Sequence, residues 1–491
     1  MDKRLIVLFI GIAAVGTAAF GQDSFEEWKR QQDADFESFL AEEDRQFAEF
    51  LQTEWEEFEA FKANTYDPEP KPVVAPSVTP GYTKESVDEA GKYFERRVTV
   101  PTNPPANPDV SKFNEEYQQK KRNTFTVRFF GNLELYLPNP GNPGLTIGAP
   151  LSNKKFSDAW VTLNKWEYAD LLEECEALRK RAKLNDWAYF KFISKVASAL
   201  NPDSVIAADI VSWFLLVKSG YDVRVGYSAD GGKVYILLPA EDMIYDVLYF
   251  YFTAAGPFYY FFSEGSPAKN VGSFYTYTHN NPETGRSVDM RIPEVPEFRD
   301  DLSARTLNFM YRGEPYSIEV QIDQNIVSIG KEYPQTDLDI YFATPVSMNT
   351  RHSLVGSLQI LVDGLSEREA VNLLLRFVQT AFEYQTDQQQ FGIEKPMFVE
   401  ESLFYPYCDC EDRSIMFSYL VEEIMGLDVV ALDYPGHIAT AVRFSKPVSG
   451  DSIRYNGSRY VICDPTYINA DIGMSMPRYR TARPKVIDIS R

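Results

Sequence analysis

The sequence predicts an α+β protein with a long amphipathic helix near its N-terminus and an added β-rich region within its globular body. Three observations support this fold class. Aromatic residues recur every eleven positions within residues 23–66, a proline-rich segment follows at 67–108, and helical and strand patterns alternate from about residue 109 onward. With 491 residues, of which 44% are hydrophobic, the chain is long enough for several domains with buried cores.

The overall charge excludes one class of partner. The chain has 49 Lys and Arg against 71 Asp and Glu, for a net charge of −22. Nucleic-acid-binding proteins track phosphates with clustered basic side chains, and an acidic chain is unsuited to that. We therefore expect no nucleic-acid partner.

Residues 1–21 have the pattern of a secretory signal peptide. Lys3 and Arg4 form a basic start, an apolar core follows, and the small residues Ala19 and Gly21 stand at the cleavage-site positions. The apolar core of about 15 residues is shorter than the ~20 that a spanning helix needs. We expect a secreted or periplasmic protein with no membrane span after the leader is cleaved; an uncleaved anchor is the alternative.

The segment 23–66 is predicted to be an acidic amphipathic helix. Because three helical turns take about 10.8 residues, side chains eleven apart stay on one narrow face. Between residues 23 and 62 the chain has 14 acidic and 4 basic side chains, so the remaining surface is strongly negative. The helix could self-associate as a coiled coil, fold back on the body, or dock into a partner protein. Its two aromatic rows are Phe25, Phe36, Phe47 and Phe58, and Trp28, Phe39, Phe50 and Phe61.

The remaining segments are predicted from composition and periodicity. The prolines of 67–108 favour an extended linker. Residues 109–270 form an α/β region, with a strand pair in 124–137, two helices in 156–200, and a helix followed by two strands in 209–238. Residues 271–360 form the β-rich region, because apolar and polar residues alternate between 305 and 345. The last domain, residues 361–491, has a helix that starts at the capping box of Ser366 and Glu369.

The segment 404–420, FYPYCDCEDRSIMFSYL, carries the chemistry. Apolar residues at helical spacing follow Asp412, so Cys410 stands where a helix begins, and the positive end of a helix dipole favours a thiolate. His437 heads a later strand, and Asp464 follows the next one. A thiol, an imidazole and a carboxylate in this arrangement form a nucleophile, a base and a group that orients the base.

At these residues the chain resembles the transglutaminase-like superfamily, which has a papain-type fold. CEDRS opens a helix, a glycine near the helix end precedes a strand, and GHIATAV and VICDPTY follow. The resemblance covers about residues 365–475 and implies a transglutaminase-like core with Cys410 as nucleophile, His437 as base and Asp464 as its orienting group. One departure is Ala439, where the family often has an aromatic residue.

We therefore expect an exported cysteine-dependent acyl-transfer enzyme that acts on a peptide or protein substrate without a cofactor. Hydrolysis of a peptide or amide is favoured over cross-linking. The Cys410 N–H is a candidate oxyanion donor, and a second donor is expected at Tyr405, Tyr407 or a Gln within 385–390. The alternative is a non-catalytic binding or assembly protein that keeps the same fold.

Two other uses of the cysteines stay open. A metal ion could be held by Cys408, Cys410, His437 and Cys463, although the Cys-x-Cys spacing is tighter than in usual zinc sites. In an oxidising compartment, Cys408 could instead pair with Cys463. Cys175 lies in a predicted helix and is expected to be structural.

The region 109–270 resembles an earlier, degenerate copy of the last domain. WFLLVKSGYDVRVGY at 213–227 follows the same helix, glycine, strand order as YLVEEIMGLDVVALD at 419–433. With Gly220 aligned to Gly426, Cys410 falls on Ser204 and His437 falls near Gly231. The copy would therefore lack both the thiol and the imidazole.

Overall fold

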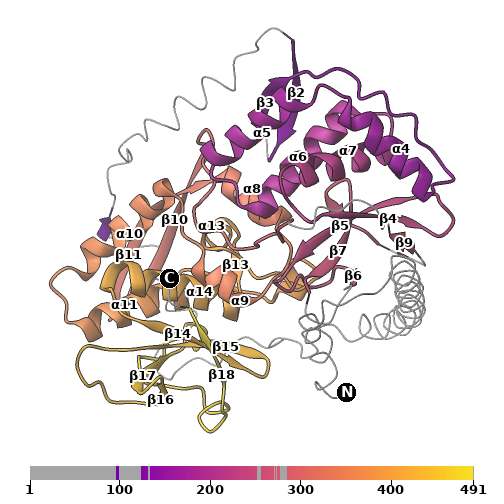
Figure 1. Ribbon diagram of the computed structural model, residues 1–491. Helices are drawn as coiled ribbons and strands as arrows, with labels where there is room; N and C mark the ends of the chain where they lie inside the picture. The colour runs from indigo at the N-terminus through magenta and orange to yellow at the C-terminus, as the bar shows by residue number, and fades with distance from the viewer. Residues whose placement is uncertain are drawn as a thin grey trace, which may run out of the picture. The chain divides into compact units, whose positions relative to one another are not determined.

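The computed structural model describes residues 96–98, 123–130, 133–250, 256–269, 271, 274–276 and 285–489 (Figure 1). The chain divides into two units, Met1–Tyr66 and Asp67–Arg491, and all described residues belong to the second. The predicted signal peptide, the acidic helix of 23–66 and most of the linker lie outside the described residues. Within them, no helix is long and apolar enough to cross a membrane.

The described chain is α+β, and its first half runs from a hairpin through four helices to a sheet. The hairpin packs on α6, which packs on α7, and α7 covers the strands β4 and β5. The elements are β2 (Thr124–Phe129), β3 (Leu133–Pro138), α4 (Asn153–Asn164), α5 (Ala169–Arg181), α6 (Asp186–Leu200), α7 (Val205–Lys218), β4 (Arg224–Ser228), β5 (Val234–Ala240), β6 (Tyr249–Phe250), β7 (Phe258–Ser263), β8 (Ser266–Pro267) and β9 (Phe274–Thr276).

The second half repeats this order. A hairpin packs on α11, which packs on α14, and α14 covers β14 and β15. The elements are β10 (Leu302–Tyr311), β11 (Glu314–Asp323), α8 (Gln324–Glu332), α9 (Leu338–Ala343), α10 (Met348–Val362), α11 (Glu367–Thr380), β12 (Glu383–Tyr384), α12 (Asp387–Gln390), α13 (Val399–Phe404), β13 (Tyr407–Cys408), α14 (Cys410–Leu420), the π-helix η1 (Val421–Met425), β14 (Val429–Tyr434), β15 (His437–Val442), β16 (Ser452–Tyr455), β17 (Ser458–Cys463) and β18 (Lys485–Asp488).

The two large sheets have the same strand order. The first is β6-β7-β5-β4-β9 and the second is β16-β17-β15-β14-β18, with antiparallel pairing throughout both. In each, the strand that follows the helix pairs with the next strand and with the last one. The second sheet lies at the yellow end of the colour scale in Figure 1.

Local sequence signals account for several of these elements. The hairpin β2–β3, the helix α7 and the strands β4 and β5 lie where the pattern predicts them. At the start of α11, Ser366 accepts a hydrogen bond from the Glu369 N–H at 3.4 Å, and Glu369 accepts one from the Ser366 N–H at 3.3 Å. The predicted capping box is therefore present.

Two predictions are wrong. Residues 156–200 belong to three helices, not two. Of the alternating stretch 305–345, only the part in the hairpin β10–β11 is strand, because the part after Asp323 contains the helices α8 and α9. The Asp323 carboxylate accepts the Asn325 N–H at 2.9 Å and so caps α8, whose apolar residues Ile326 and Ile329 are three apart and share one buried face.

The segment 67–108 is not a linker throughout. Residues 96–98 form β1 (Arg96–Val98), which pairs in parallel with β11 over Tyr316 to Ile318. This strand extends the β10–β11 hairpin to a three-stranded sheet.

Candidate catalytic site

The structure places Cys410 at the first position of α14, where the sequence predicts a helix to begin. The preceding residue, Asp409, has extended backbone angles, and its N–H donates to the Asp412 carboxylate at 3.1 Å. The helix ends with a π-helical turn at Gly426, whose φ of 62° is left-handed and suits glycine. The Cys410 side chain is 0% exposed.

His437 and Asp464 are brought together at one edge of the second sheet. His437 begins β15, Asp464 directly follows β17, and these two strands pair antiparallel. The His437 Nε2 atom lies 2.9 Å from Asp464 Oδ2. Because the carboxylate engages Nε2, Nδ1 is the ring nitrogen left to exchange a proton with another group.

Helix α14 faces the strand that carries the histidine. The Ser414 hydroxyl donates to the carbonyl of Ile438 at 3.2 Å, and Ile438 is the neighbour of His437. Residues four apart on a helix share a face, so Cys410 lies on the same side of α14 as Ser414. The fold therefore presents the thiol and the imidazole from packed, adjacent elements.

The loop after Asp464 is anchored by a side chain of α11. The Gln379 amide donates from Nε2 to the carbonyls of Asp464, Tyr467 and Ala470 at 3.0, 2.9 and 3.0 Å. Asp464 itself accepts the N–H groups of Thr466 and Tyr467 on Oδ1, at 3.0 and 3.1 Å. This leaves Oδ2 directed at His437 and fixes the imidazole in orientation.

Tyrosines stack on the imidazole. The ring of Tyr479 lies 4.9 Å from that of His437, at an interplanar angle of 15°, and Tyr434 lies 6.4 Å away on the same hairpin. The Tyr479 hydroxyl donates to the carbonyl of Pro435 at 3.3 Å. Sequence reasoning missed both residues. Tyr434 could have been found from its place beside the turn, but Tyr479 belongs to an irregular segment with no local signal.

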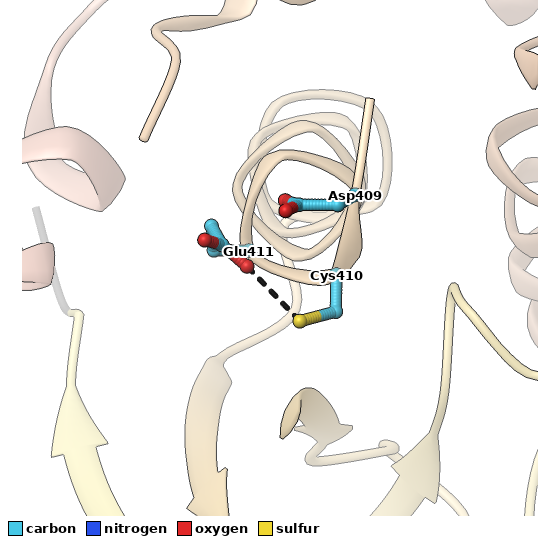
Figure 2. A group of neighbouring side chains, drawn as sticks. All are labelled: Asp409, Cys410 and Glu411. Carbon is cyan, nitrogen blue, oxygen red and sulfur yellow. Dashed lines mark hydrogen bonds between the residues drawn. The ribbon is translucent and has the colours of Figure 1, made fainter. Parts of the chain in front are cut away.

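The thiol donates to a carboxylate. Cys410 Sγ lies 3.0 Å from Glu411 Oε2, and both side chains are fully buried (Figure 2). The side chains of Asp409, Cys410 and Glu411 converge at the first turn of α14, with ligand-type atoms within 4.8 Å of one another. A carboxylate beside a thiol disfavours the thiolate, so Glu411 opposes the effect of the helix dipole.

More carboxylates meet at the same place. Asp387, on the short helix α12, donates its N–H to Asp409 Oδ2 at 3.3 Å, and β12 pairs with β13 just before the cysteine. Burial and mutual repulsion raise the pKa values of Asp387, Asp409 and Asp412 well above their usual range. The sequence shows the acidic residues of the motif DCED at 409–412, but it does not show that they lie close to Asp387.

Of the other three cysteines, Cys408 and Cys463 are the disulfide partners or metal ligands considered from the sequence. Cys175, Cys408 and Cys463 are buried free thiols, so no Cys408–Cys463 disulfide is present. Burial raises the pKa of Cys408 to about 11 and that of Cys463 well above the ordinary value. Among the described residues, the groups of neighbouring ligand atoms include neither Cys408, His437 nor Cys463, so the geometry does not support the metal site considered from the sequence.

Comparison of the sequence with models of known protein families gives no match, and comparison with curated proteins gives none. The resemblance to the transglutaminase-like superfamily therefore depends on the motifs and on the geometry of Cys410, His437 and Asp464 alone.

Proposed function

We propose that the protein is an exported cysteine-dependent acyl-transfer enzyme of the transglutaminase-like type, and that it hydrolyses a peptide or amide bond. Cys410 is the nucleophile, His437 takes and returns the proton, and Asp464 holds the ring. The observation that carries the proposal is the 2.9 Å contact of His437 Nε2 with Asp464, where His437 begins the strand β15 that packs on the helix of Cys410.

The reaction follows from these positions. The thiolate attacks the carbonyl carbon, and the N–H groups at the start of α14 face the oxygen that becomes negative. The imidazolium protonates the leaving amine, and a thioester to Cys410 remains. Water, deprotonated by the same imidazole, then hydrolyses the thioester and releases the acid. All three residues are nearly fully buried, at 0%, 1% and 2% exposure, so the substrate must reach them through an opening of the surrounding segments.

A second candidate is a non-catalytic binding or assembly protein on the same fold. The contact of the Cys410 thiol with Glu411 favours it, since a buried thiol that donates to a carboxylate is held in its neutral form. The two candidates differ in one measurable property, which is the reactivity of this thiol.

The experiment measures the rate of iodoacetamide labelling at Cys410 against pH, for the wild type and for His437→Ala, with the labelled residue identified by mass spectrometry. An ordinary thiol with a pKa of ~8.5 is only about 3% thiolate at pH 7, so an imidazole that removes its proton can raise the rate by up to about 30-fold. We expect the wild type to label rapidly at pH 7 and the variant to lose this advantage.

The matched control is Cys408→Ser, which removes a buried thiol two positions away and leaves the triad intact. Its labelling at Cys410 should equal that of the wild type. A slow titration of Cys410 that is the same in wild type and His437→Ala would refute catalysis and favour the binding protein.

We also propose that the two halves of the described chain are copies of one unit, with a non-catalytic first copy. The shared strand order, and the hairpin and helix pair before each sheet, support this. Strand register also refines the alignment: Arg224 pairs with Leu237, and Val430 with Ala441, each four residues after the helix-terminal glycine. His437 then matches Lys233 rather than Gly231, because the first hairpin turn is two residues longer.

A further inference from the structure

Three carboxylates from two segments, α12 and the start of α14, meet at the first turn of α14. The side chains are those of Asp387, Asp409 and Asp412, and one oxygen of each lies within 4.8 Å of the others. Oxygens bound to one Ca²⁺ at 2.3–2.6 Å lie at most about 5 Å apart. The three oxygens are therefore close enough to share a single ion of this kind.

Backbone N–H groups hold these carboxylates in place. Asp387 Oδ2 accepts the Lys395 N–H at 2.7 Å, and Asp412 Oδ1 accepts the Met397 N–H at 2.8 Å. Asp409 Oδ2 accepts the Asp387 N–H at 3.3 Å. Ligands fixed in this way lose little conformational freedom when an ion binds.

One oxygen within this group, Oδ1 of Asp387, has no hydrogen-bond partner among the described residues, and its side chain is 1% exposed. Burying a carboxylate oxygen without a partner is costly. A buried carboxylate oxygen without a partner, next to two other carboxylates, indicates a ligand that accepts lone pairs, such as a metal cation.

No basic side chain in the described part of the chain forms an ion pair with these three residues. The nearest lysine in sequence, Lys395, instead pairs with Glu401 at 2.6 Å. Buried carboxylates are ordinarily paired with a cation or coordinated to a metal.

We propose that Asp387, Asp409 and Asp412 form a binding site for a hard divalent cation of the Ca²⁺ class, at the N-terminal end of α14 and beside Cys410. Carboxylate oxygens are the ligands that Ca²⁺ prefers, and Glu411 and Glu394 belong to an overlapping group with Asp387 that can supply further oxygens. The site does not depend on Cys410 being catalytic, because its ligands are the carboxylates.

A cation bound at this site would change the reactivity of the Cys410 thiol through Glu411. The ion neutralises part of the negative charge that surrounds Cys410, and it competes with the thiol for the Glu411 carboxylate. This coupling rests on the proposed function and is separate from cation binding itself, which has its own readout.

The experiment titrates CaCl₂ into the chelator-treated full chain by calorimetry in 150 mM NaCl, for the wild type, Asp387→Asn and Asp409→Asn. We expect one site per chain that is weakened at least about tenfold in each variant, above a weak background from the acidic surface. Asp387 lies outside α14, so its variant carries the test even where Asp409→Asn fails to fold.

Asp209→Asn is the matched control, since Asp209 is an equally buried aspartate whose oxygens are satisfied by Ser263 and Glu264. It should bind Ca²⁺ as the wild type does. Ca²⁺ should also raise the melting temperature of the wild type but not of Asp387→Asn.

Equal binding by the wild type and Asp387→Asn, or absence of a stoichiometric site, would overturn the proposal. So would tighter binding of Zn²⁺ that disappears in Cys410→Ser, because the ion would then be held by the thiol. Loss of the cation site with unchanged Cys410 labelling would refute the coupling alone, and slow labelling with an intact cation site would refute catalysis alone.

Discussion

The two large sheets compare closely in topology and differ in chemistry. Each follows a helix that ends at a left-handed glycine, Gly220 or Gly426, and each pairs its strands in the same order. Strand register matches Phe261 of the first sheet with Ile462 of the second, so Ser263 stands where Asp464 stands. The same scaffold therefore exists with and without the proposed reactive groups.

The matched helix ends differ in exposure as well. Ser204 caps α7 by accepting the Ala207 N–H at 3.2 Å, and Val205 beside it is 47% exposed. A cavity of about 650 Å³ is lined there by Ser204 and Ala207. At α14 the corresponding Cys410 and Glu411 are fully buried. The comparison teaches that the same helix-to-sheet arrangement tolerates an open helix start in one half and a fully buried one in the other.

The largest expected effect distinguishes His437 from Lys233, the residue at the matching position of the first sheet. His437→Ala should lower the turnover of a peptide amide, identified by screening a library, by about 10²- to 10⁴-fold, because the general base is lost. Lys233→Ala should leave turnover unchanged, since Ser204 stands where the second half has Cys410. An equal loss in both variants would break the comparison, because the first sheet would then contribute to the reaction.

The next effect concerns a polar contact in the first half of the chain. It is made by Ser263, which stands at the position of Asp464. Asp209 on α7 accepts the Ser263 hydroxyl at 2.7 Å, and burial raises its pKa from 3.8 to about 6. Between these values the folded state binds the proton more strongly than the unfolded state. The free energy of unfolding therefore falls as pH rises from about 4 to 6, by about 3 kcal/mol at 1.36 kcal/mol per pKa unit.

Asp209→Asn removes this dependence and keeps both hydrogen bonds, because the amide can accept from Glu264 and donate to Ser263. Urea unfolding should find the variant more stable than the wild type at pH 7.5, by up to about 3 kcal/mol, and equal to it below pH 4. A stability difference that stays constant with pH would contradict the assigned titration.

The sequence predicts the local parts of the site and not its surroundings. The helix at Cys410 and the strand at His437 follow from short-range patterns, and so does the capping box at Ser366. The helices α8 and α9 differ from the strand prediction because short apolar runs fit both the helical and the strand period, and only tertiary packing decides between them. Tyr479 lies in an irregular segment and Asp387 begins a helix of only four residues, so neither has a periodic sequence pattern that would place it at the site.

A smaller effect tests how the charge of Glu411 influences the Cys410 thiol. Glu411→Gln keeps an oxygen that can accept the Cys410 thiol but removes the charge, so the thiolate becomes less unfavourable. We expect iodoacetamide labelling of Cys410 at pH 7 to rise by up to about tenfold. The matched position in α7 is the exposed Val205, and Val205→Glu should leave this rate unchanged. Slower labelling in Glu411→Gln would mean that the carboxylate assists deprotonation.

The smallest expected effect is on the stability of the first copy. Ser204→Ala removes the side chain that caps α7 and should lower the free energy of unfolding by ~1 kcal/mol, as measured by urea denaturation. Ser204→Asp should restore it, because aspartate caps as well as serine. Neither change should alter labelling at Cys410. If Ser204→Ala instead lowered turnover at constant stability, the cavity above α7 would take part in substrate binding, and the first copy would have kept a function of the second.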